Sequence, residues 1–322
     1  MHTTAPMHKT ARQKPAIVVT AADLADEALA LLGDFEIVFA GKQPDEQSLI
    51  TLCARHQPVA IIVRYGRITP GIIAASSQLR VISKHGSGID TIDVEAARSR
   101  NVAVKAATAV NAGAVAEHTW ALILACTKSV TQLNARMHAG YWDKAIHKSI
   151  ELGGRTLGLV GLGAIGRRVA AIGIAMGMRI LAHDPHVKAA PPDIVLTTLP
   201  ELLQAADIVS LHCPLTADNR HMINRKTLSQ MRHGAILVNT ARGGLVDESA
   251  IHDALESGFL GAAALDSFET EPPPPEHLLR NITNLVMTPH VGGVTRDAYI
   301  NMGIAAARNI LAGLQAADQK QT

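Results

Sequence analysis

LVGLGAIGRR, residues 159–168, lies close to the middle of a chain of 322 residues and carries three glycines in the spacing GxGxxG. Glycine turns are common, so this spacing alone is a weak signal. Here an apolar run precedes the glycines and a helical pattern follows them, which is the order in which a dinucleotide-binding unit begins. The stretch therefore predicts a Rossmann-type unit that starts halfway along the chain, and the residues before it need another role.

Each glycine of the motif has a distinct expected task. Gly161 would allow the tight turn, Gly163 would let the backbone approach a pyrophosphate, and Gly166 would let the helix pack closely on the strand. Ala164 and Ile165 lie at the predicted helix start, where backbone N–H groups and the positive end of the helix dipole attract phosphate. These five residues form the predicted pyrophosphate site.

An acidic residue stands at the distance that such a unit needs. Asp184 follows Gly166 by 18 residues and comes directly after the apolar run 179–183. A carboxylate there would bind two ribose hydroxyls and repel a 2′-phosphate, which favours NAD over NADP. His186 and Lys188 lie nearby, and an aspartate that only caps a turn is the alternative.

Short apolar runs alternate with amphipathic segments along most of the chain. Buried parallel strands form continuous apolar runs with helices in the crossovers, so the pattern predicts an α/β fold. A first series of strands is expected at residues 16–20, 36–40, 59–63, 80–84 and 102–106. A second series is expected at residues 156–161, 179–183, 207–212, 235–240, 261–266 and 284–290. We predict two doubly wound parallel sheets.

The end of the chain predicts that the first domain is split. Residues 296–317 form one amphipathic pattern with no strand left to join in the second series. We expect this helix to return and pack on the first domain. Residues 16–106 and 295–322 would then form one discontinuous domain, residues 107–294 a second domain inserted into it, and residues 1–15 a loose tail.

Composition argues against several classes of protein. The 30 basic residues nearly balance the 28 acidic ones, and aromatic residues make up 3%, so neither a phosphate-tracking surface nor a base-stacking platform is indicated. No apolar run approaches the ~20 residues of a membrane span, and the polar, basic first residues do not resemble a secretory signal. Cys53, Cys126 and Cys213 are far apart, which indicates reduced thiols. We predict a cytoplasmic protein that binds neither nucleic acid nor membrane.

Three further stretches end strands of the second series on the carboxyl side, where such folds bind ligands. They are NTARGGLVDE (239–248), LDSFETEPPPP (265–275) and TPHVGG (288–293). Together they supply an arginine, two acids and a histidine: Arg242, Asp266, Glu271 and His290.

These residue types suit proton-coupled chemistry on a carboxylic acid. The Arg242 guanidinium could hold a carboxylate in a bidentate fork. His290 titrates near neutral pH and could exchange a proton, and Glu271 beside it would orient the ring and favour its protonated form. No pair of histidines has HExxH or another metal-binding spacing, so we predict no metal.

The motifs resemble those of the NAD-dependent 2-hydroxyacid dehydrogenases that act on D-isomers, a family that includes phosphoglycerate, glycerate/hydroxypyruvate and D-lactate dehydrogenases. GLGAIGRRVA, VNTARGGLVDE, ALDSFETEPP and TPHVGG occur in the family's order, and the resemblance extends over nearly all of the chain. It implies hydride transfer between NAD(H) and a small D-2-hydroxy acid or its 2-oxo acid, such as 3-phosphoglycerate, glycerate/hydroxypyruvate or glyoxylate. It also implies a Rossmann cofactor domain inserted into a flavodoxin-like substrate domain built from both chain ends.

The resemblance also implies a role for each motif residue. Arg242 would bind the substrate carboxylate and carbonyl, His290 would donate the proton in reduction with Glu271 as its partner, and Asp266 would approach the nicotinamide amide. The further implied cofactor contacts are Thr240, Ala241, Arg242, His290, Gly292 and Gly293. The implied substrate contacts are Arg64, Ser87, Gly88, Arg242 and His290. The loop VRYGRIT that carries Arg64 is one residue shorter than the family spacing, so Arg67 receives no role.

The segment 112–150 resembles the family's dimer helix and arm. A helix is expected at 112–133, followed by an arm with Tyr141 and Trp142, and we predict a homodimer. Two alternatives stay open, a phosphite dehydrogenase with a similar triad and an NAD-sensing binding protein on the same scaffold. Formate dehydrogenases resemble the chain but place Gln where Glu271 stands, which argues against that activity.

Overall fold

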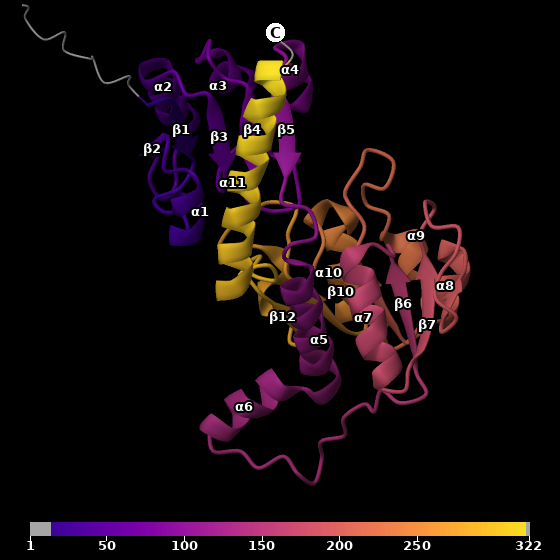
Figure 1. Cartoon of the computed structure of the whole chain (residues 1–322). Coiled ribbons are helices and arrows are strands. Elements are labelled where there is room, and N and C mark those ends of the chain that lie inside the picture. Colours follow the sequence, from indigo (N-terminus) through magenta and orange to yellow (C-terminus); the bar gives the residue numbers. More distant parts are fainter. Residues whose placement is uncertain (1–13, 320–322) are drawn as a thin grey trace, which may run out of the picture. The chain divides into compact units, whose positions relative to one another are not determined.

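The computed structural model describes residues 14–319. This part of the chain divides into two compact units. Unit 1 is formed by both ends, up to Val110 and from Arg296 onward, and unit 2 is formed by Asn111–Thr295. Each unit is built around its own parallel sheet (Figure 1).

Unit 1 contains a five-stranded parallel sheet in the order β2-β1-β3-β4-β5, which is the flavodoxin-like order 2-1-3-4-5. The strands are β1 (Ala16–Val19), β2 (Glu36–Phe39), β3 (Ala60–Val63), β4 (Val81–Lys84) and β5 (Ala103–Ala106). The helices are α1 (Asp26–Leu31), α2 (Glu46–His56), α3 (Pro70–Ala74), α4 (Val94–Ser99) and α11 (Arg296–Gln319). All five strands lie within the predicted segments, because strands buried on both faces give continuous apolar runs.

The last helix belongs to this unit. α11 packs against α1 and the sheet strands β4 and β5 (Figure 1). Its buried residues Ala306, Ala307 and Ile310 join Ile17 and Val81 in one core. The approach is close: a Cβ at Gly313 would lie 2.7 Å from a methyl carbon of Val81. Glycine is therefore required where this helix crosses the sheet.

Unit 2 contains a seven-stranded parallel sheet in the order β12-β11-β10-β9-β6-β7-β8. Read from β8, this is the order 3-2-1-4-5-6 of a Rossmann fold with one more strand, so the predicted pair of doubly wound sheets is confirmed. The strands are β6 (Thr156–Val160), β7 (Arg179–His183), β8 (Ile194–Leu196), β9 (Ile208–Leu211), β10 (Ala235–Asn239), β11 (Leu260–Leu265) and β12 (Leu285–Met287). The connecting helices are α7 (Ala164–Ala175), α8 (Leu199–Ala205), α9 (Arg225–Leu228) and α10 (Glu248–Glu256), with short 3₁₀ turns at Gly243–Leu245 and Leu278–Asn281.

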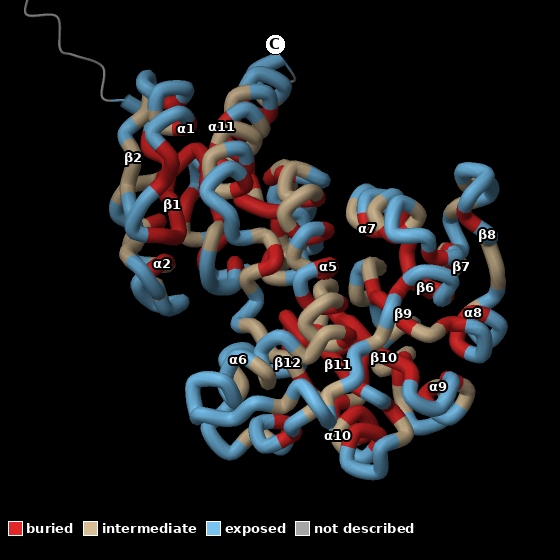
Figure 2. Tube along the Cα trace, turned by 90° about the horizontal axis from the view of Figure 1, so that it is seen from below, coloured by how far each residue is buried: buried red, intermediate tan, exposed pale blue. Residues whose placement is uncertain are grey.

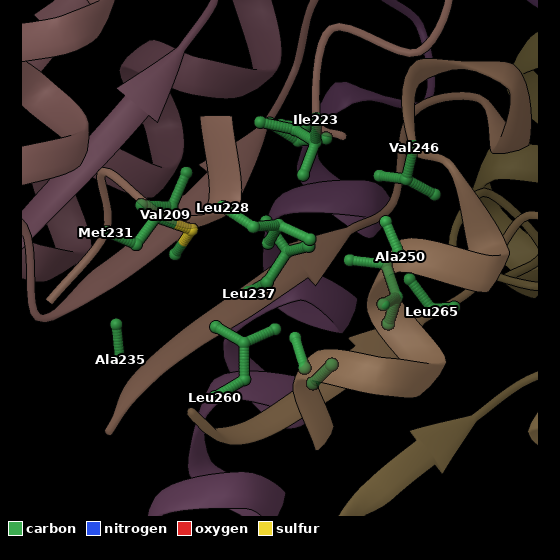
Figure 3. Close-up of a cluster of buried hydrophobic side chains, with 14 of the residues drawn as sticks. Val209, Ile223, Leu228, Met231, Ala235, Leu237, Val246, Ala250, Leu260 and Leu265 are labelled. Atoms are coloured by element: carbon green, nitrogen blue, oxygen red, sulfur yellow. The ribbon is translucent and has the colours of Figure 1, made fainter. Parts of the chain in front are cut away.

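The sheet of unit 2 is buried on both faces. Val209 and Leu237 face one apolar cluster with Leu228, Met231 and Ala250 (Figure 3), while the residue just before each of them belongs to a second cluster that includes Trp120. Side chains alternate between the faces of a strand, so consecutive apolar residues serve both clusters.

Two sequence-based expectations for unit 2 are wrong. The second series was expected to have six strands, but the three-residue β8 adds a seventh at the sheet edge. The helix expected at 112–133 is instead two helices, α5 (Ala112–Lys128) and α6 (Val130–His138). They are separated by Ser129, whose φ of 52° is left-handed and ends the first helix.

α5 and α6 differ in burial. α5 packs on α7 and the sheet, whereas no residue of α6 is buried (Figure 2). None of the helices in residues 14–319 combines the length and the apolar character that crossing a membrane requires.

Candidate active site

The glycine turn between β6 and α7 has the geometry that a dinucleotide site needs. Gly161 has φ +100°, and a Cβ on it would lie 2.7 Å from the carbonyl of His212. A Cβ on Gly166 would lie 2.2 Å from the Gly161 carbonyl oxygen. A Cβ on Gly163, by contrast, would meet no atom within 4 Å. Packing inside the protein thus requires the first and third glycines, while the second borders open space at the start of α7, as the approach of a pyrophosphate requires.

Asp184 is bound to this turn. Its Oδ2 accepts a hydrogen bond from the Leu162 N–H at 2.8 Å, and its Oδ1 accepts one from the His186 N–H at 2.9 Å. Burial alone would raise the pKa of Asp184, but these two N–H groups outweigh burial and lower it. The residue is an ionised carboxylate one position after β7. Each oxygen accepts one backbone N–H and has further acceptor capacity for a ribose hydroxyl.

Arg242 is held by the turn that follows β10. The buried Asn239 side chain accepts from the Ala241 N–H at 3.0 Å and donates to the Arg242 carbonyl at 2.9 Å. Nη1 of Arg242 donates to the Ala241 carbonyl at 2.8 Å. Thr240, beside them, exchanges a hydrogen bond with Thr119 of α5 at 2.9 Å. The turn therefore fixes the backbone around the predicted substrate anchor.

Glu271 and His290 form a direct pair. Nδ1 of His290 lies 2.7 Å from Oε2 and 2.9 Å from Oε1 of Glu271, and Oε1 also accepts the Phe268 N–H at 3.0 Å. The His290 side chain is 45% exposed and the Glu271 side chain 38%, so a small molecule could reach the pair. His290 has φ +54°, an uncommon backbone conformation for a residue other than glycine and one that often occurs at functional sites.

The pair changes the titration of both groups. The Glu271 hydrogen bond raises the pKa of His290. Burial would raise the pKa of Glu271, but the bonds from His290 and the Phe268 N–H outweigh it and lower that pKa. The positive charge of Arg242 also lowers the pKa of both groups, so Arg242 lies within electrostatic reach of the pair. Unit 2 thus brings together the three residues predicted to be catalytic.

Asp266 is buried and organises the loop that carries His290. Its carboxylate accepts from the Thr288 hydroxyl at 2.6 Å and from the N–H groups of Val291 and Gly292 at 2.9 and 2.8 Å. Nε2 of His118 also lies 3.3 Å from it. The loop glycines are packed tightly: a Cβ on Gly292 would lie 2.9 Å from Asp266, and one on Gly293 2.6 Å from the Asn111 side chain. These contacts give Asp266, Gly292 and Gly293 a structural role within unit 2. Their contacts with the cofactor stay predictions.

Arg64 in unit 1 is paired with an acid that the sequence analysis did not single out. Its Nη1 donates to the side chain and to the carbonyl of Asp23, and its guanidinium lies 4.8 Å from the ring centre of Tyr299 and 5.3 Å from that of Tyr65. The Tyr299 hydroxyl donates to the same carboxylate at 3.0 Å. Arg64 is therefore held by its own unit.

Ser87 and Gly88 lie in the loop after β4, in unit 1 with Arg64. The Ser87 side chain is exposed, and its hydroxyl lies 3.4 Å from the Ala107 carbonyl.

Sequence reasoning missed several residues beside these sites. His212 and Cys213 follow β9, and their backbone packs against Gly161 of the glycine turn. Burial lowers the pKa of His212 to about 4. The signal was present, because His212 follows β9 on the carboxyl side of the sheet, as Arg242 follows β10. His118 and Thr288 share a hydrogen bond of 3.0 Å that no local pattern predicts. Within residues 14–319, no cluster of three or more acidic, histidine or cysteine side chains could hold a metal ion.

Comparison with protein families gives a match to the model described as "D-isomer specific 2-hydroxyacid dehydrogenase, NAD binding domain", which covers residues 120–292. A hydroxypyruvate reductase of Thermotoga maritima is 39% identical over 78% of this chain and 83% of that protein. A glyoxylate reductase of Aeropyrum pernix is 37% identical over 94% of each. A D-3-phosphoglycerate dehydrogenase of Methanocaldococcus jannaschii is 40% identical over 78% of this chain, and the match spans 48% of that longer protein.

Solved structures agree with these matches. The TT0316 protein of Thermus thermophilus superposes with a TM-score of 0.87 at 36% identity, over 94% of this chain and 97% of that one. An acyclic imino acid reductase in complex with NADPH and D-Arg superposes with a TM-score of 0.84 at 26% identity, over 94% of this chain and 97% of that one. Both similarities extend over most of the described residues of this chain.

Proposed function

The chain belongs to the D-isomer specific 2-hydroxyacid dehydrogenase family, and from this premise we propose how its residues act and on what. It is an oxidoreductase that interconverts a hydroxy acid and an oxo acid with a nicotinamide cofactor. The proposal adds a specific triad, Arg242, Glu271 and His290, a small D-2-hydroxy acid as substrate, and NAD as the preferred cofactor. The paired geometry of Glu271 and His290 is the observation that carries the proposal.

His290 exchanges the proton of the reaction. Glu271 occupies Nδ1, so Nε2 is the nitrogen that gives a proton to the developing alkoxide during reduction and takes it back during oxidation. The ionised Glu271 keeps the ring charged until the proton has left. Arg242 pairs with the substrate carboxylate and orients the oxo group toward His290. A nicotinamide held at the glycine turn would supply or accept the hydride.

The residues of the glycine turn fit a dinucleotide. Gly163 leaves room for the pyrophosphate, the first N–H groups of α7 at Ala164 and Ile165 suit its charge, and Asp184 suits the ribose hydroxyls. A negative charge on Asp184 opposes a 2′-phosphate. We expect NADH to be used better than NADPH, and Asp184→Ala to reduce the difference in kcat/KM. Equal kcat/KM for both cofactors in the unchanged protein would argue against this role.

We assign the substrate to the class of short 2-oxo acids that includes hydroxypyruvate and glyoxylate, which the names of two relatives support. In this proposal unit 1 is the substrate domain, the Ser87–Gly88 backbone receives the substrate carboxylate, and Arg64 is a second substrate anchor. 3-Phosphoglycerate is the longer candidate.

We also propose that the protein is a cytoplasmic homodimer. The observation in favour of assembly is apolar exposure: Trp142 and Ile146 are 74% and 76% exposed in the arm that follows α6. Light scattering at micromolar concentration should give the mass of a dimer.

The decisive experiment follows absorbance at 340 nm with NADH and a panel of glyoxylate, hydroxypyruvate and 3-phosphohydroxypyruvate. We expect turnover that depends on a 2-oxo acid. Binding of NADH without turnover of any of these acids would favour an NAD-sensing binding protein. Reduction of NAD by phosphite would favour a phosphite dehydrogenase.

A further inference from the structure

A second glutamate and histidine in unit 2 are paired, close to the first pair in sequence. Oε2 of Glu248 lies 2.9 Å from Nε2 of His277. Their side chains are only 8% and 9% exposed, so neither is a surface ion pair. Glu248 closes the stretch that carries Arg242, and His277 follows the proline-rich loop that carries Glu271.

Both nitrogens of His277 are used within the protein. The Leu279 N–H donates to Nδ1 at 3.4 Å, so the ring carries its proton on Nε2 and donates it to Glu248. Glu248 accepts a second bond, because its Oε1 receives the Glu269 N–H at 2.9 Å. The Glu248 carboxylate, at the start of α10, therefore bonds to Glu269 near the beginning of the loop 266–277 and to His277 at its end.

The hydrogen bond between Glu248 and the Glu269 N–H is connected to Glu271 through a single peptide. The Glu269 N–H belongs to the peptide that joins Phe268 and Glu269, and the Phe268 N–H donates to Oε1 of Glu271 at 3.0 Å. The same peptide packs against Gly243, where a Cβ would lie 1.9 Å from the Phe268 carbonyl carbon and 2.4 Å from the Glu269 nitrogen. The peptide is thus held both by packing on the residue after Arg242 and by the hydrogen bond to the Glu248 carboxylate.

We propose that Glu248 and His277 are a positioning pair, which sets the Phe268–Glu269 peptide and through it the Glu271 carboxylate that orients His290. This role deepens the proposed function and rests on it. The pair touches neither substrate nor cofactor in this scheme. Glu248 supplies two acceptor oxygens, one for each N–H donor, whereas an amide in its place would supply only one.

The test compares variants that keep or break these bonds, by the kcat and KM of glyoxylate and hydroxypyruvate reduction with NADH. Glu248→Gln keeps the volume but sets an NH₂ group against one donor, so we expect kcat to fall about tenfold with little change in KM. His277→Leu should do the same. His277→Gln can donate to Glu248 and accept from Leu279, so it should retain the activity of the unchanged protein.

A double-variant cycle separates positioning from general destabilisation. If Glu248 acts through Glu271, adding Glu248→Gln to Glu271→Gln should lower kcat no further, whereas independent effects would multiply. Ile251→Val removes one buried methylene from the same helix and is the stability control, with kcat unchanged. Multiplying effects would overturn the proposal, as would equal losses in His277→Leu and His277→Gln. Full activity of His290→Gln would instead overturn the proposed function itself.

Discussion

Unit 2 contains two glutamate–histidine pairs with nearly the same geometry and opposite surroundings. Glu271–His290 and Glu248–His277 have closest N–O distances of 2.7 and 2.9 Å. The first pair is 38–45% exposed and the second 8–9%. In residues 14–319, Nε2 of His290 has no hydrogen-bond partner, whereas both nitrogens of His277 are occupied.

This difference separates a group that can react from a group that holds structure. A ring with one nitrogen occupied by a carboxylate and the other open can exchange a proton with a ligand. A ring with both nitrogens satisfied inside the protein cannot do so without breaking a buried hydrogen bond. The same two residue types therefore serve chemistry at one place and support it at the other.

The largest expected difference comes from replacing the histidine of each pair, in separate variants, by glutamine. His290→Gln can still donate to Glu271 but cannot transfer a proton, so kcat for reduction should fall about 10²–10⁴-fold. His277→Gln retains both contacts of the ring and should leave kcat nearly unchanged. Steady-state kinetics with NADH and glyoxylate measure both, and equal losses would remove the distinction between the pairs.

For the free energy of unfolding we expect the opposite order, with a larger loss when the buried pair is broken than when the exposed pair is broken. Glu248→Ala removes a buried carboxylate and leaves the part-buried donors of Glu269 and His277 without their acceptor, which should lower the free energy of unfolding by about 3 kcal/mol. Glu271→Ala breaks a half-exposed pair and should cost about 1 kcal/mol or less. Urea unfolding at pH 7 measures both values. A larger cost for Glu271→Ala would show that exposure does not distinguish the pairs as argued.

The sequence predicted one of these pairs and not the other. Glu271 and His290 were found because each follows a strand on its carboxyl side, where ligands of this fold bind. Glu248 is the last residue of a motif and the first residue of α10, and His277 lies 29 residues away beyond four prolines. Their pairing depends on the path of the loop 266–277, which no periodicity encodes.

The fold shows the same division between regular and irregular structure. Buried strands such as β1 and β3 were predictable because all their residues are apolar. β8 was missed because it has three residues and its Val195 is 58% exposed at the sheet edge. The break at Ser129 was missed because the apolar pattern of α5 continues into α6 and only the backbone turns left-handed. Arg64 was found, but its partner Asp23 lies 41 residues earlier and was not.

A smaller effect is expected on the proton transfer itself. Glu271→Gln keeps the shape of the side chain and a hydrogen bond but removes the charge that raises the pKa of His290. Reduction requires the protonated ring, so its rate falls as pH rises through that pKa. Without the carboxylate this falling limb should move to lower pH by about one unit, equivalent to about 1.4 kcal/mol. Asp253→Asn, which removes an exposed carboxylate on α10, is the control and should leave the limb in place.

The oxidation direction provides an independent check of the same assignment. Oxidation of the hydroxy acid requires the neutral ring, so its rate rises with pH through the pKa of His290. If Glu271 acts by charge, its replacement by Gln must move this rising limb to lower pH by the same amount as the falling limb of reduction. Oxidation at pH 6 to 7 would then be favoured while reduction is impaired. Equal loss in both directions at every pH would mean that Glu271 only fixes the position of the ring, and the electrostatic part of its role would be wrong.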